Sequence, residues 1–258
     1  MKIALTGGAS GIGAELARLL MAAGHEVHAY DLFEPSTDVT SWTETDLSDP
    51  NSIDKAVEAT TMTFDALINN AGLPPKEGMA ELILNVNFFG MKRFMDGMLP
   101  KLTAEASIVN TASRAGAFWR DHLDQVKALM GIELSELPEF ISKNEIDATR
   151  AYNLSKEAVI VMTHARCEEM IASGFRMNSV SPAAVSTGIL DDFVNAFGPK
   201  VAANIKRAGR PGLPEEIADV IAYLISPQSH WIKGQDIVID GGMGAMGMTD
   251  MMGLNGSD

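Results

Sequence analysis

Hydrophobic and polar positions alternate along the chain in two different periods. Short runs that are apolar, or that alternate with period two, predict strands. These runs lie at 3–5, 26–30, 43–46, 66–68, 107–111, 175–180 and 236–239. Between them, apolar residues recur every three or four positions, which predicts helices. The clearest helix follows the first strand, with Leu16 and Leu20 on one face and Gly24 at its end.

The order of these elements predicts the fold class. Further helices are predicted at 79–99, 152–172 and 214–226. Strands that alternate with helices form parallel βαβ units, whose right-handed crossovers place helices on both faces of the sheet. We therefore expect an α/β fold, a doubly wound parallel sheet of seven strands in a single domain that spans 1–258.

Two segments depart from this alternation. Residues 116–148 are acidic with helix-like apolar spacing, which predicts a helical insertion instead of a second domain. The tail beyond Asp240 is rich in glycine and methionine and shows no regular period. Its methionines suit either a pliable lid or interface, or a frayed tail.

Composition narrows the functional classes. The net charge of −14 disfavours nucleic acid as a partner, because phosphate backbones would repel the chain. No apolar run approaches the roughly 20 residues of a membrane helix, and the first residues form a strand pattern instead of a signal peptide. The lone Cys167 favours a structural thiol in a reducing cytoplasm. His25 and His28 lack a third ligand, so no metal is expected.

The first strand runs directly into a glycine-rich loop, Thr6-Gly7-Gly8-Ala9-Ser10-Gly11-Ile12-Gly13, and then into a helix. Glycines allow a tight turn and a close approach of backbone to a pyrophosphate, which the helix N-terminus attracts. A glycine-rich loop without a ligand is the alternative. The strand–loop–helix context favours a dinucleotide site.

Asp31 follows the second strand, 18 residues after Gly13. A carboxylate at this place can accept hydrogen bonds from both hydroxyls of an adenosine ribose and would repel a 2′-phosphate. The glycine loop carries no Lys or Arg, and Leu32 follows the aspartate. These residues predict NAD in preference to NADP, unless Asp31 merely ends a strand at the surface.

Tyr152 and Lys156 stand four residues apart in a helical stretch and therefore share a helix face. A free tyrosine has a pKa near ~10, and a neighbouring ammonium lowers that pKa by stabilising the phenolate. Tyr152 is thus a candidate acid/base that exchanges a proton with an alcohol or carbonyl oxygen. Such a Tyr–Lys pair is common by chance. Its place before the sixth strand is what makes it evidence for a catalytic site.

In its motifs the sequence resembles the short-chain dehydrogenase/reductase family, which has a Rossmann-type fold. The motifs cover nearly the whole chain in the family's order. They are TGGASGIG at 6–13, Asp46, NNAG at 69–72, NVNFFG at 85–90, IVNTAS at 108–113, YNLSK at 152–156, RMNSVSP at 176–182 and IDGG at 239–242.

The resemblance implies roles for the matching residues. Ser113 would hydrogen-bond the reacting oxygen, Lys156 would hold the nicotinamide ribose, and Asn87 would fix a water that relays protons from Lys156. Together with Tyr152 they would form the catalytic tetrad. Cofactor contacts are implied, besides Tyr152 and Lys156, at Gly7, Ser10, Gly11, Ile12, Gly13, Asp31, Asp46, Leu47, Asn69, Ala71, Gly72, Pro182, Val185 and Thr187.

Two departures from the family pattern stand out. Ala183 follows Pro182 where the family usually has glycine, and Ser113 lies 39 residues before Tyr152 because of the 116–148 segment. That segment and HWIKGQDIVIDGG at 230–242 resemble the branch that contains 3α-hydroxysteroid dehydrogenase/carbonyl reductase and coniferyl alcohol dehydrogenase. The resemblance implies a bulky hydrophobic, aromatic or steroid-like alcohol or carbonyl as substrate. Phe118, Trp119 and Trp231 are either apolar surface for it or core and subunit contacts.

Three functional hypotheses remain open from the sequence. The leading one is an NAD-dependent dehydrogenase or carbonyl reductase. A catalytically silent NAD-binding regulator or scaffold is the second, and an epimerase on the same scaffold is the third. The resemblance also implies a homo-oligomer, a dimer or a tetramer, because relatives commonly pair the tyrosine-bearing helix across a subunit boundary.

Overall fold

Seven parallel strands form one sheet in the computed structural model, which describes residues 1–254. The last four residues of the predicted 1–258 domain lie outside the described part. The strand order is β3-β2-β1-β4-β5-β6-β7. The strands are β1 (Lys2–Thr6), β2 (Glu26–Asp31), β3 (Ser41–Glu44), β4 (Phe64–Asn69), β5 (Leu102–Thr111), β6 (Arg176–Pro182) and β7 (Asp236–Ile239).

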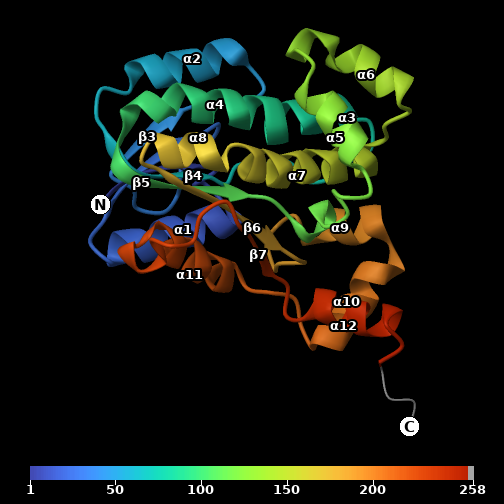
Figure 1. Ribbon diagram of the computed structural model, residues 1–258. Coiled ribbons are helices and arrows are strands. Elements are labelled where there is room, and N and C mark those ends of the chain that lie inside the picture. Colours follow the sequence, from blue (N-terminus) through green and yellow to red (C-terminus); the bar gives the residue numbers. More distant parts are fainter. Residues whose placement is uncertain (255–258) are drawn as a thin grey trace.

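Helices cover both faces of this sheet, and an apolar core lies under each layer (Figure 1). On one face lie α1 (Gly11–Ala22) and α11 (Pro214–Ile225), which pack through Leu16, Leu20 and Ile221. The other face carries α2 (Pro50–Ala59), α4 (Met91–Met98), α7 (Ala148–Ala165) and α8 (Cys167–Ala172). The predicted doubly wound α/β fold is confirmed.

The sheet order reverses between β1 and β4, and this determines where a ligand can bind. In open α/β sheets the crevice at such a switch point, beyond the carboxyl ends of the strands, is the usual ligand site. Three further helices gather at one end of the molecule: α9 (Leu190–Phe197), α10 (Pro199–Ala208) and α12 (Met243–Met251) (Figure 1). The methionine-rich tail therefore contains a helix where the sequence shows no period.

The predicted helix at 79–99 is three consecutive pieces. They are α3 (Ala80–Leu84), a π-helical turn at Asn85–Gly90, and α4. At Gly90 a Cβ atom would lie 1.9 Å from the carbonyl oxygen of Leu47, so only glycine fits beside that loop. Turns of π-helix are rare and occur often at functional sites.

Element boundaries differ from the prediction in two places. β3 begins two residues earlier than predicted, because this short edge strand has little apolar patterning to mark its ends. α7 begins at Ala148, four residues earlier, because the carboxylate of Asp147 caps it by accepting the N–H of Arg150 at 2.7 Å. The predicted helix at 152–172 is in fact α7 followed by α8.

The segment at 116–148 contains α5 (Leu123–Met130), which lies beside α7, and α6 (Leu137–Lys143), which lies farther out and contacts α3 (Figure 1). Glu157 lies on α7, and its side chain is only 1% exposed. Its carboxylate accepts hydrogen bonds from both terminal nitrogens of Arg150, at 2.9 and 2.6 Å. The ring of His122 lies 2.7 Å from the same carboxylate, and Arg150 also donates to Gln125 of α5. These contacts fasten α5 to the helix that carries Tyr152.

Within residues 1–254, every helix is too short or too polar to cross a bilayer.

Candidate active site

A cleft of about 1380 Å³ opens at the carboxyl ends of the strands. Pockets for a single small ligand usually measure about 300–1,000 Å³, so this cleft has room for a cofactor and a second molecule. Most of the predicted site residues line it. They are Gly7, Ser10, Gly11, Ile12, Asp31, Asp46, Leu47, Ala71, Gly72, Ser113, Tyr152, Lys156, Pro182, Val185 and Thr187.

The glycine loop between β1 and α1 forms one end of the cleft. Gly7 has a φ of +72°, and a Cβ on it would lie 2.6 Å from the Cα of Ala71. A Cβ on Gly13 would lie 1.8 Å from the carbonyl oxygen of Gly7, so Gly13 packs α1 onto the loop and does not line the cleft. The N-terminus of α1 thereby reaches the cleft wall, where it favours an anionic group.

Asp31 is held in a defined orientation at the end of β2. Its Oδ2 accepts the N–H of Ala9 at 2.9 Å and its Oδ1 accepts the N–H of Phe33 at 3.0 Å. An ionised carboxylate has about four acceptor sites, so two remain for hydroxyl donors. Leu32 and Phe33 beside it contribute apolar surface and no cation.

Asp46 and Leu47 lie on the loop after β3, on the same side of the cleft. The Oδ1 of Asp46 accepts both the N–H and the hydroxyl of Ser48, at 2.8 and 2.7 Å. These bonds turn the carboxylate toward its own loop. Leu47 is buried, and its carbonyl contacts the π-helical turn at Gly90.

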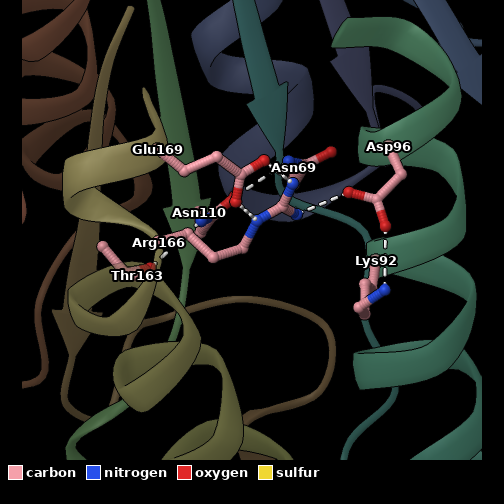
Figure 2. A network of polar contacts seen from close by, with 7 residues as sticks. All are labelled: Asn69, Lys92, Asp96, Asn110, Thr163, Arg166 and Glu169. Carbon is pink, nitrogen blue, oxygen red and sulfur yellow. Dashed lines mark hydrogen bonds and ion pairs between the residues drawn. The ribbon is translucent and has the colours of Figure 1, made fainter. Parts of the chain in front are cut away.

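Asn69, predicted to line the cofactor groove, does not reach the cleft. Its side-chain amide donates to Asn110 at 2.8 Å, and Asn110 donates to the hydroxyl of Thr163 on α7 at 3.1 Å. Figure 2 shows this row of side-chain hydrogen bonds beside Arg166, which forms ion pairs with Asp96 of α4 and Glu169 of α8. Both sets of contacts join α7 and α8 to their neighbours and are structural.

The neighbouring Asn70 lines the cleft instead, and it donates to the carbonyl oxygen of Gly7 at 3.0 Å. The motif NNAG contains two identical side chains at the end of a strand. Only the place where β4 ends decides which of them leaves the sheet toward the cleft.

Three predicted catalytic residues meet in the cleft where β5 and α7 approach each other. Tyr152 and Lys156 each retain only 5% exposure. The Nζ of Lys156 donates to the carbonyl oxygen of Thr111 at 2.9 Å and lies 5.8 Å from the centre of the Tyr152 ring. The hydroxyl of Ser113 is hydrogen-bonded to the phenol of Tyr152 and accepts the N–H of Ala115.

Burial moves the pKa values of this pair in opposite directions. It raises the pKa of Tyr152 to about 12, although the hydrogen bond to Ser113 acts the other way. It lowers the pKa of Lys156 to about 8. The sequence predicts a lowered pKa for Tyr152, and in the ligand-free chain that prediction is wrong: loss of water disfavours the phenolate more than the neighbouring groups stabilise it.

Asn87 sits behind Lys156 and does not line the cleft. Its amide accepts the N–H of Leu73 at 2.7 Å and donates to the carbonyl oxygen of Leu73 at 3.0 Å. A Cβ on Gly72 would lie 3.2 Å from Asn87 Oδ1 and 3.4 Å from Lys156 Nζ, so the two side chains meet around this glycine. The π-helical turn is the element that presents Asn87 there.

The far end of the cleft has an apolar wall from α9, α10 and α12, formed chiefly by Phe193, Phe197, Val201, Met248 and Met251. The ring of Phe193 lies edge-on to that of Tyr152, with centroids 5.2 Å apart. This wall is not among the features predicted from the sequence. The four-residue spacing of Phe193 and Phe197 after the sixth strand is the signal that would have indicated it.

The three aromatic residues considered for substrate contact have different environments. Phe118 lines the cleft at 56% exposure. Trp119 packs against the core, with the guanidinium of Arg120 4.2 Å from its ring centre. Trp231 is 87% exposed and lies outside the cleft lining. Only Phe118 is therefore placed to contact a ligand in this cleft.

Two family models match the chain. The one described as short chain dehydrogenase matches residues 2–123, and the one described as Enoyl-(Acyl carrier protein) reductase matches residues 139–244.

Among characterised proteins, the chain is 36% identical to coniferyl-alcohol dehydrogenase of Pseudomonas sp. strain HR199, an alignment that covers 94% of this chain and 96% of the relative. It is 31% identical to 3-alpha-hydroxysteroid dehydrogenase/carbonyl reductase of Comamonas testosteroni, over 95% of this chain and 96% of the relative. Among solved structures, 3-alpha-hydroxysteroid dehydrogenase of Pseudomonas sp. B-0831 complexed with NADH superimposes with a TM-score of 0.81. It is 29% identical, and all of both chains is covered.

Proposed function

Because the chain belongs to the short-chain dehydrogenase family, we propose a specific activity within the alcohol and carbonyl oxidoreductase chemistry of that family. The chain interconverts a bulky hydrophobic, aromatic or steroid-like alcohol and its carbonyl with NAD as the preferred cofactor. Tyr152 is the acid/base. The observation that carries this proposal is the meeting of Tyr152, Ser113 and Lys156 in one cleft whose other end carries Asp31 and the glycine loop.

The residues of the cleft fit a dinucleotide. Gly7 brings the loop backbone against Ala71, and the N-terminus of α1 is directed at the space where a pyrophosphate would lie. Asp31 retains acceptor capacity for ribose hydroxyls, and Lys156 would hold the ribose of the nicotinamide. When bound, the nicotinamide ring supplies the chemistry of accepting or giving a hydride.

The chain's own residues transfer the proton to or from the substrate oxygen. With a pKa of about 12, the phenol of Tyr152 is protonated at neutral pH and ready to donate to a carbonyl oxygen. In the opposite direction it must accept the alcohol proton as its phenolate, so oxidation should accelerate as pH rises. Ser113 hydrogen-bonds the same oxygen, and Lys156, whose pKa is about 8, is mostly an ammonium at pH 7 and stabilises negative charge there.

The substrate class rests on the apolar wall and on the relatives. Phe193, Phe197 and Met248 offer surface for a large hydrophobic molecule next to Tyr152. Two characterised relatives above 30% identity are named for coniferyl alcohol and for 3-alpha-hydroxysteroids, both of which are bulky alcohols.

Replacing the phenol tests the catalytic assignment. Tyr152→Phe should lower kcat by about 10²–10⁴-fold, because proton transfer by a positioned side chain contributes about that factor. The Kd for NAD should stay within about twofold, since the ring remains. Stopped-flow turnover and isothermal titration with NAD measure the two. A variant with unchanged turnover would disprove the role of Tyr152.

The cofactor preference is tested at Asp31. Asp31→Ala should weaken NAD binding about tenfold or more and narrow the advantage of NAD over NADP, because the variant loses acceptors for the ribose and also the repulsion of a 2′-phosphate. The measurement is kcat/KM with each cofactor. A wild type that already prefers NADP would contradict the proposal.

A silent regulator and an epimerase are the competing functions. A screen that follows absorbance of reduced cofactor across aromatic, allylic, steroidal and short aliphatic alcohols separates them from a dehydrogenase. A regulator shows no turnover, and an epimerase shows turnover without net change in absorbance.

A further inference from the structure

The turn that follows Ser113 is attached to two different parts of the molecule. It is a short 3₁₀ turn, Arg114–Gly116. At its far end, a Cβ on Gly116 would lie 2.8 Å from a backbone carbon atom of α7, so the turn packs directly against that helix. At its near end, the guanidinium of Arg114 forms an ion pair with Asp240, at 3.2 Å, in the segment between β7 and α12.

Asp240 is itself held in a defined position. Its side chain is 10% exposed, and its two oxygens accept the N–H groups of Gly242 and Gly244 at 2.9 and 2.7 Å, at the start of α12. A Cβ on Gly244 would lie 3.0 Å from Nη2 of Arg114, so a glycine leaves room for the guanidinium there. A second carboxylate near Arg114, that of Asp236, is already hydrogen-bonded to two serines of β6.

The hydrogen bonds that Ser113 makes to its own turn do not fix that turn relative to the rest of the molecule. Its hydroxyl accepts the N–H of Ala115 at 3.1 Å, and its carbonyl oxygen accepts the N–H of Gly116 at 2.9 Å. The ion pair of Arg114 is the contact that joins the near end of the turn to the C-terminal segment. The side chain of Arg114 is 32% exposed, so water screens this ion pair less than one on the open surface.

We propose that Arg114 is a positioning residue for the proposed reaction. Its ion pair with Asp240 fixes the turn and thereby places the hydroxyl of Ser113 beside the phenol of Tyr152. This inference rests on the proposed function, in which both hydroxyls hydrogen-bond the reacting oxygen. A misplacement of about 1 Å in such a group can lower a rate by about 100-fold, so a contact outside the reacting groups affects catalysis. The start of α12 thus takes part in the active site, although it supplies no reacting group.

A double-mutant cycle tests this inference. Ser113→Ala should lower kcat by about 100-fold, because it removes one hydrogen-bond donor to the reacting oxygen. Arg114→Met replaces the guanidinium with an uncharged side chain and should lower kcat by about tenfold. Added to Ser113→Ala, the same substitution should lower kcat by less than about twofold, because Arg114 acts through Ser113. Full additivity of the two losses would overturn the inference.

Three further variants separate a positioning role from a general loss of stability. Asp240→Asn weakens the same ion pair from its other side and should lower kcat as Arg114→Met does. Arg114→Lys keeps a cation for Asp240 and should restore most of the activity. Arg120→Met removes an exposed arginine of the same segment, outside the cleft lining, and should leave kcat unchanged. A wild-type kcat in Arg114→Met or Asp240→Asn, or a kcat in Arg114→Lys as low as in Arg114→Met, contradicts the positioning role.

A crystal structure of Arg114→Met keeps the test independent of turnover. The hydroxyls of Ser113 and Tyr152 should lie more than about 3.5 Å apart in the variant, whereas they are hydrogen-bonded in the wild type. A hydrogen bond retained in the variant would overturn the inference. If the wild type oxidises no alcohol but the variant shows this displacement, the proposed activity fails while the role of Arg114 stands.

Discussion

Lys156 combines a place in the proposed active site with an unfavourable charge. It is buried beside Tyr152, and its ammonium hydrogen-bonds only the carbonyl oxygen of Thr111 among the described residues. Burial lowers its pKa from 10.5 to about 8. The native chain therefore releases this proton at a lower pH than the unfolded chain does. While Lys156 is charged, its burial lowers the free energy of unfolding.

The free energy of unfolding depends on pH because the pKa of Lys156 is lower in the native chain than in the unfolded chain. Between about pH 8 and 10.5 the unfolded chain binds more protons at this residue, so stability rises with pH across the window. From pH 7.5 to 9.5 the free energy of unfolding should rise by about 2 kcal/mol more in the wild type than in Lys156→Met. Urea unfolding at the two pH values measures the difference. Equal rises in both proteins would show that Lys156 is not the group responsible.

The positions of single residues were predictable where a motif places one polar side chain at a strand end or on a helix face. Tyr152, Lys156, Ser113 and Asp31 all line the cleft, because their motifs follow strand ends or share one helix face. The direction of the pKa shift of Tyr152 was not predictable, since it depends on how completely packing removes water. Sequence spacing contains no information about that.

At the scale of elements, the contacts of Glu157 connect the start of α5 with α7, the helix that carries Tyr152. The carboxylate is almost fully buried and is shared by Arg150 of its own helix and His122 just before α5. A buried carboxylate is stable in such a place only while its cationic partner, the guanidinium of Arg150, remains. We infer that Glu157, together with Arg150, helps to orient the start of α5.

Removing that carboxylate should be costly. Glu157→Ala leaves the partly buried guanidinium of Arg150 unpaired, and we expect a loss of about 3 kcal/mol in the free energy of unfolding. The matched control is Glu169→Ala, which removes an exposed carboxylate from Arg166 while Asp96 remains, and which should cost less than about 1 kcal/mol. Similar losses in urea unfolding of the two variants would contradict the special position of Glu157.

Elements with a strong apolar period were predicted well, and elements without one were not. β1, β4 and α1 are where the sequence places them, because each buries a continuous apolar face. The π-helical turn at Asn85–Gly90 and the helix in the methionine-rich tail were missed. The first depends on a backbone contact between Gly90 and Leu47, and the second on packing against α10, and neither leaves a periodic signal.

At the scale of the whole molecule, the placement of α5 bears on assembly. Members of this family commonly pair the tyrosine-bearing helix across a subunit boundary, and here α5 is already fastened to that helix by Arg150 and Glu157. We therefore expect a dimer and not a tetramer. Light scattering should give about twice the chain mass of 27.6 kDa. A mass near four chains would show that α5 leaves the usual contact intact.

Methionines in the wall of the cleft make this part of the enzyme susceptible to oxidation. Met248 and Met251 are 61% and 86% exposed and line the end of the cleft that the substrate would occupy. Peroxide converts such thioethers to polar, chiral sulfoxides, which a methionine sulfoxide reductase can reverse. The hydrophobic surface next to Tyr152 is thus sensitive to oxidative stress, so affinity for apolar substrates would fall in oxidising conditions and recover after repair.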